Sequence, residues 1–177
     1  TGAPGGGQSG MSHMMQELLA IKRFREGQAE MSMRQQRSRM QEREAALQQV
    51  QEELARMLEA ALHSEKALYA DLCSRLVKLR DLEDASHFVA ALKQQELLQR
   101  DAVSEAETLL AQAQQALTQA RVAHQEAVQQ TSKFLELAQR FDLLAAQEAE
   151  RKEDLEMEEA ASIARDKEDW HYEDERQ

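Results

Sequence analysis

Apolar side chains recur along residues 85–144 at alternating steps of three and four. The positions are Ala85, Phe88, Leu92, Gln95, Gln99, Ala102, Ala106, Leu109, Ala113, Ala116, Ala120, Ala123, Ala127, Gln130, Phe134, Leu137, Phe141 and Leu144. Only three of these eighteen positions are polar, and all three are glutamines. A heptad pattern sustained over this length predicts a coiled coil, and its seven-residue period predicts a left-handed supercoil.

A second heptad pattern precedes the first and carries larger side chains. Its positions are Met33, Met40, Leu47, Leu54, Ala61 and Leu68, with Val50 and Met57 between them. The stretch "VKLRDLEDASHF" separates the two patterns and contains neither Gly nor Pro. Asp81 can cap a new helix, with Asp84 at the third helical position after it. We therefore predict a turn near residues 77–82.

Folding the chain at this turn places the two predicted helices side by side. The two residue numbers of each facing pair then add up to about 160. The predicted pairs are Leu54 with Ala106, Leu47 with Ala113, Met40 with Ala120, and Met33 with Ala127. Large side chains then face alanines, which keeps the interface dense while the backbones approach closely. Farther along, Phe134, Leu137 and Phe141 would face residues 18–26.

The composition excludes most other folds. Five of the six glycines and the single proline lie within the first ten residues, whereas the turns of a sheet need such residues. We predict an all-α fold, a long two-helix antiparallel coiled-coil hairpin over residues 14–160. Its first helix, from Met14 to about Leu76, would be about 95 Å long. Residues 1–13 read as an expression scar or disordered start, and residues 161–177 as an acidic frayed tail.

Charge is distributed unevenly along the chain, which has a formal net charge of −11. Residues 147–177 hold 13 acidic and 5 basic side chains, whereas residues 14–43 hold 7 basic and 4 acidic ones. This balance argues against nucleic acid and favours partners of differing charge at the two ends. No apolar run reaches the length of about 20 residues needed to cross a bilayer, so direct membrane insertion is not expected. The single cysteine, Cys73, suits a reducing compartment.

No catalytic constellation is apparent in the sequence. No Gly-rich phosphate loop can exist after residue 27, and the scattered histidines lack helical partners at metal-ligand spacing. We therefore expect no enzyme activity, no cofactor and no metal. Apolar residues outside the heptad pattern could bind a partner or simply cover the ends of the coiled coil. These residues are Ile21, Phe24, Leu62, Tyr69, Leu135 and Trp170.

Two stretches resemble a known family. "LLAIKRFREGQAE" near the start and "KFLELAQRFDLL" toward the end are similar to the ends of the YscO (SctO) proteins of bacterial type III secretion, whose flagellar relative is FliJ. The resemblance implies a virulence-associated stalk in the bacterial cytoplasm, peripheral to the inner-membrane secretion apparatus. Such a stalk would insert into the hexameric secretion ATPase and couple it to the cytoplasmic domain of the export gate protein. Some members also bind secretion chaperones.

The resemblance also implies two binding sites on a monomer. The ATPase-binding residues would be Ile21, Lys22, Arg25, Phe134, Leu137 and Phe141. The export-gate-binding residues would be Tyr69, Leu72, Leu76, Phe88 and Leu92.

Two other functions fit the same residue pattern. A general coiled-coil adaptor would self-associate through its heptads, and a holdase-type chaperone would grip unfolded chains with its apolar ends.

Overall fold

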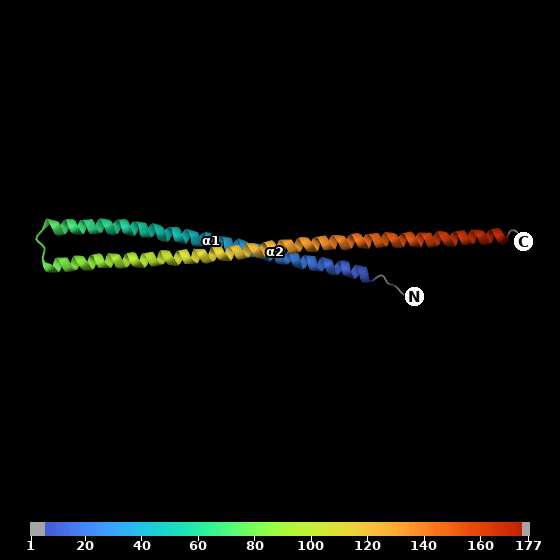
Figure 1. Cartoon of the computed structure of the whole chain (residues 1–177), viewed down its shortest axis with the longest axis horizontal. Coiled ribbons are helices and arrows are strands. Elements are labelled where there is room, and N and C mark those ends of the chain that lie inside the picture. The colour runs from blue at the N-terminus through green and yellow to red at the C-terminus, as the bar shows by residue number, and fades with distance from the viewer. Residues whose placement is uncertain (1–5, 175–177) are drawn as a thin grey trace. The chain divides into compact units, whose positions relative to one another are not determined.

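The computed structural model describes the backbone of residues 6–174 and the side chains of residues 10–165. It contains two helices, α1 (Gly6–Ser74) and α2 (Leu79–Asp174), and no strand in the described backbone. Contacts between the helices run antiparallel: low-numbered residues of α1 meet high-numbered residues of α2 (Figure 1). The predicted all-α hairpin of two long helices is thereby confirmed.

Both helices extend beyond the limits expected from the sequence. α1 begins at Gly6, before the predicted start at Met14, because adding residues to an existing helix costs far less than nucleating one. α2 continues to Asp174, through most of the segment expected to form an acidic tail. The side chain of Trp170, one of the apolar residues outside the heptad pattern, lies outside the described residues. All described side chains of residues 146–165 are exposed.

The connection between the helices spans residues 75–78, earlier than the predicted turn at 77–82. Lys78 takes the N-cap position of α2, and its carbonyl oxygen accepts hydrogen bonds from the Asp81 and Leu82 amides at 3.0 and 3.4 Å. Asp81 is therefore the third helical residue, and not the cap. Its carboxylate Oδ2 accepts a hydrogen bond from the Lys78 amide at 3.0 Å, which is half of a capping box.

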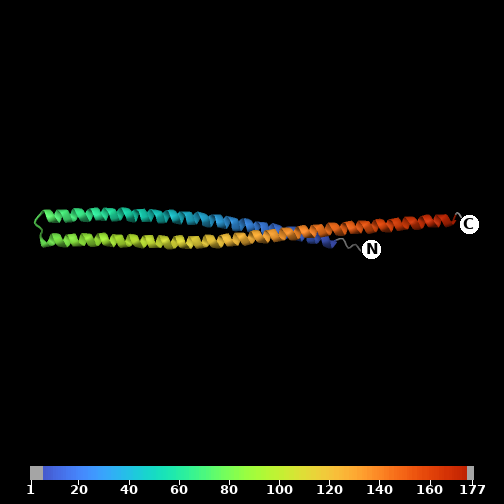
Figure 2. The same cartoon turned by 45° about the horizontal axis from the view of Figure 1, so that its top comes forward.

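The chain divides into two compact units. Unit 2 comprises residues 29–124. Within it, the parts of α1 and α2 that the loop connects lie side by side in both views (Figures 1 and 2). The predicted α1 pattern is confirmed, because each of its eight positions is half-buried. On α2, one predicted column is also half-buried, namely Ala85, Leu92, Gln99, Ala106, Ala113 and Ala120.

The second predicted column of α2 is confirmed at Ala102, Leu109 and Ala116, which are half-buried, but a further buried column lies one residue later. It contains Val89, Glu96, Val103, Leu110 and Leu117. Phe88 and Gln95, which were predicted to be in the interface, are exposed, and Leu117 is the most buried side chain described, at 3% exposure. A helix with 3.6 residues per turn buries a stripe wider than two heptad positions, so either neighbour can take the second column. Larger side chains on α2 therefore join the predicted alanines in the interface.

The register in unit 2 also differs from the predicted one. Gln99 Nε2 donates to the Val50 carbonyl oxygen at 3.3 Å, and Arg75 Nη1 lies 3.6 Å from Asp81 Oδ2. The residue numbers of these pairs total 149 and 156, below the predicted 160. The loop lies about three residues earlier than predicted. The alignment of α1 with α2 is therefore shifted by about one heptad from the predicted alignment. Leu47 therefore falls near Ala106 instead of Ala113, and large side chains still face alanines.

Unit 1 comprises residues 1–28 together with residues 125–177. Leu19 is its most buried described side chain, at 9% exposure. Lys22 Nζ donates to Gln130 Oε1 at 2.6 Å and lies 5.0 Å from the centroid of the Phe134 ring. The contact between Phe134 and Lys22 agrees with the prediction that Phe134 faces residues 18–26.

Candidate functional site

Exposed apolar side chains gather around the loop of unit 2. Leu76 is fully exposed, and Tyr69 and Phe88 are 56% and 44% exposed. The other two predicted export-gate residues, Leu72 and Leu92, are half-buried between the helices. The structure therefore divides the predicted set into three exposed side chains and two half-buried ones.

The sequence prediction missed two further exposed leucines beside the loop. Leu79 and Leu82 are 74% and 52% exposed. Both lie in the first turn of α2, which the predicted turn at 77–82 had assigned to the loop. Their signal was present in the stretch "VKLRDL", where apolar residues alternate with charged ones, but the helix boundary was needed to interpret it. Together with Leu76, they form the tip cluster: Leu76, Leu79 and Leu82.

Two open grooves flank the helices next to the tip cluster. The larger has a volume of about 440 Å³ and is lined by Tyr69, Leu82 and Val89, with Lys93 at its edge. The smaller has a volume of about 280 Å³ and is bordered by Phe88 and by charged residues that include Arg75. The first groove suits an apolar segment, whereas the second also presents charge. A partner can therefore recognise the two sides of the loop differently.

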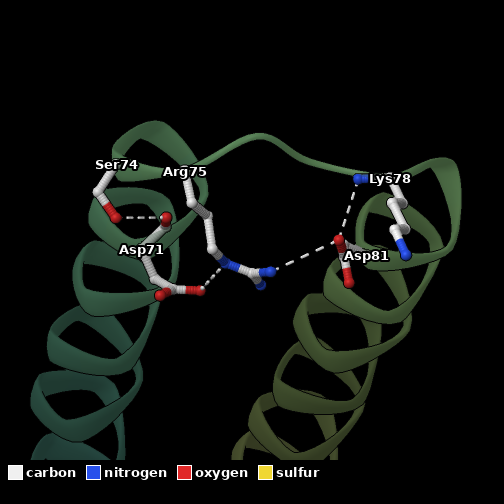
Figure 3. Close-up of polar contacts among 5 residues, drawn as sticks. All are labelled: Asp71, Ser74, Arg75, Lys78 and Asp81. Carbon is white, nitrogen blue, oxygen red and sulfur yellow. Dashed lines mark hydrogen bonds and ion pairs between the residues drawn. The ribbon is translucent and has the colours of Figure 1, made fainter.

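Polar contacts hold the loop in place (Figure 3). Arg75 Nε donates to Asp71 Oδ2 at 3.1 Å on its own helix, and Arg75 Nη1 lies 3.6 Å from Asp81 Oδ2 on α2. The same Asp81 oxygen accepts the Lys78 amide, and Ser74 Oγ donates to the Asp71 carbonyl at 2.8 Å. Asp81 thus fixes the start of α2 and links it to Arg75. These contacts present Leu76 to solvent on a four-residue loop that lacks glycine.

Removing the Asp81 carboxylate should fray the first turn of α2. We expect Asp81→Ala to cost about 0.5–1.5 kcal/mol, mostly from the lost bond to the Lys78 amide, since exposed ion pairs contribute little. Hydrogen exchange of the amides of residues 79–84 should accelerate. Asp84→Ala is the matched control, because the exposed Asp84 makes no hydrogen bond or ion pair within residues 10–165. Equal acceleration in both variants would contradict the capping role.

The predicted ATPase-binding residues lie in unit 1 and separate into three pairs. Lys22 and Phe134 contact each other and are half-buried, so they join α1 to α2. Ile21 and Arg25 are exposed. The remaining two residues, Leu137 and Phe141, are 42% and 37% exposed along the margin of the interface. Phe141 also borders a groove of about 150 Å³ with Met11 and Leu144.

The described side chains form no metal-binding cluster. Among residues 10–165, no three His, Cys, Asp or Glu side chains converge in a way that would hold a metal ion. Cys73 is exposed and forms no disulfide. No stretch of either helix within the described part is both long and apolar enough to cross a bilayer.

A two-helix hairpin with exposed apolar clusters at its loop and in unit 1 defines a class of coiled-coil interaction proteins. Comparison with known proteins identifies the family within that class. The family model described as type III secretion protein YscO matches residues 15–163, so this chain belongs to the YscO family. The crystal structure of type III secretion protein YscO from Vibrio parahaemolyticus is similar, with a TM-score of 0.80 and 25% identity. The match covers 86% of this chain and 96% of that one. No curated protein matches significantly.

Proposed function

We propose that this protein is a non-enzymatic stalk of a type III secretion apparatus. It inserts into the hexameric secretion ATPase through unit 1 and contacts the cytoplasmic domain of the export gate protein through the loop of unit 2. It works in the bacterial cytoplasm, peripheral to the inner membrane, and secretion chaperones are further partners. Membership of the YscO family carries this proposal.

The distribution of exposed apolar residues along α1 supports two separate binding sites. On α1, large exposed apolar side chains occur at residues 11–31 and again at residues 62–69, but none occurs at residues 32–61. One continuous helix, Gly6–Ser74, therefore carries apolar side chains suited to both partners. A helix of this kind suits a linker, because it joins two sites through a single stretch of hydrogen-bonded backbone.

A single hairpin inside a ring of six identical subunits cannot contact all of them alike. Each ATPase subunit meets a different face of the two helices, so each nucleotide site has a different free energy at a given moment. Such differential contact is what allows one component to bias the state of another. A monomeric stalk is required for this, since one hairpin must face six subunits.

The direct test is the effect of the purified protein on its cognate ATPase. We expect one chain to bind per ATPase hexamer, to promote hexamer assembly and to stimulate ATP hydrolysis. Hydrolysis rate, sedimentation of the ATPase and the molar ratio in the complex are the measurements. An ATPase whose rate and assembly are unchanged by a saturating amount of the protein would refute the stalk function.

A further inference from the structure

The α1 helix of unit 1 exposes an apolar face that points away from α2. Lys22 points toward α2, where it contacts Gln130 and Phe134. Side chains at positions i and i+2 of a helix point in directions that differ by about 200°. Phe24 therefore lies on the opposite side of α1, where it is 66% exposed. Ile21 and Met14 lie three and ten residues before Phe24 on the same face and are 48% and 49% exposed. Nothing within residues 10–165 covers this outer face, which we define as Met14, Ile21 and Phe24.

Two unpaired arginines flank Phe24. Arg23 and Arg25 are exposed, and neither makes an ion pair or hydrogen bond with any residue of the described part of the chain. The acidic residue on this face, Glu17, already lies 3.2 Å from His13 Nε2. An apolar face with free guanidinium groups beside it matches a surface that offers both apolar contact and carboxylates.

Gly27 adds room beside Phe24. A Cβ atom at this position would meet nothing within 4 Å, and the described backbone contains no residue with positive φ. Glycine in a helix interior costs about 1 kcal/mol relative to alanine, and no contact with residues 10–165 requires it here. The missing side chain leaves space for a partner to approach the Phe24 ring closely.

We infer that this outer face is the contact through which unit 1 recognises the ATPase, and that Phe24 inserts into an apolar pocket rimmed by Asp and Glu side chains. This inference rests on the proposed stalk function. Lys22 and Phe134 then stabilise the packing of α1 against α2. Phe24, Ile21 and the two arginines bind the ATPase. Most of the chain carries net negative charge and would be repelled by the Asp and Glu side chains around such a pocket. Electrostatic attraction therefore favours docking through the basic segment that contains Arg23 and Arg25.

Binding of the purified cognate ATPase hexamer to fluorescently labelled protein tests the inference. Phe24→Ser should raise the Kd at least tenfold, and the double variant Arg23→Glu, Arg25→Glu should do the same while flattening the salt dependence. The matched controls are Leu62→Ser, which removes a 55% exposed leucine of α1, and the double variant Arg37→Glu, Arg39→Glu, which reverses an equally spaced exposed pair. Both controls should bind within twofold of the wild type.

The outcomes separate the two proposals. Wild-type protein that binds and stimulates the ATPase, with Phe24→Ser and the arginine variant unchanged, would overturn the outer face while leaving the stalk function intact. Wild-type protein that fails to bind would overturn both. Vesicles containing phosphatidylglycerol form a second arm, and binding to them that depends on Phe24 would overturn the assignment to an acidic protein surface. Circular dichroism establishes that each variant remains helical.

Discussion

Leu117→Ala should lower the free energy of unfolding by about 2–3 kcal/mol. Leu117 is the most buried side chain of the described residues, and replacing a buried leucine by alanine typically costs about 2–5 kcal/mol. The lower part of that range applies because an interface only two helices wide lets solvent enter the space that is left. Urea unfolding followed by circular dichroism measures the change.

Leu97→Ala provides the matched control for this substitution. Leu97 lies on the same helix in the same unit but is 57% exposed, so we expect a change below about 0.5 kcal/mol. The comparison isolates burial, because both variants lose the same atoms from α2. If the two substitutions lowered the free energy of unfolding equally, the claim that Leu117 and its column are buried between the helices would be wrong.

The double variant Leu76→Ser, Leu79→Ser should weaken binding to the cytoplasmic domain of the export gate about tenfold to a hundredfold. Each exposed leucine of the tip cluster that becomes buried contributes roughly 1.5–3 kcal/mol, part of which is offset by ordering the side chains. Because both side chains are largely exposed in the free protein, the free energy of unfolding should hardly change. Calorimetric titration of the purified gate domain measures the affinity.

Leu97→Ser combined with Leu98→Ser is the control for the loop. These neighbouring leucines of α2 are 57% and 61% exposed, comparable to the tip cluster, but lie well away from the loop. The control should bind the gate domain as the wild type does. If both double variants lost affinity equally, general surface hydrophobicity would explain the binding and the tip cluster would have no special role.

The sequence predicted the type of fold because heptads sustained over such a length leave few alternatives. It did not determine the register. Shifting one helix by seven residues still places large side chains against alanines, so Leu47 can face Ala106 or Ala113 equally well. The choice depends on the loop, and a loop without glycine or proline carries little sequence signal. The hydrogen bond from Gln99 to the Val50 carbonyl marks the register that the chain adopts.

The exposure of the candidate site residues could not be predicted in detail from the sequence. Exposed and interfacial residues alternate within one or two positions, so a small rotation of a helix changes which of them a partner can reach. Phe88 is exposed although the pattern placed it in the interface, and Lys22 contacts Gln130 and Phe134, which the sequence alone did not predict. Long flexible side chains such as lysine select their partners only once two helices lie at a fixed offset.

Pairing of the two helices within one chain is the claim on which both binding sites depend. Spin labels at positions 49 and 100, introduced as cysteines in a Cys73→Ser background, test it by double electron–electron resonance. With labelled chains diluted into excess unlabelled protein, we expect a distance on the order of 20 Å, because packed helix axes lie about 8–10 Å apart and each label arm adds length. If that signal disappeared on dilution, or the distance approached the roughly 75 Å of a continuous helix, the intramolecular hairpin would be wrong.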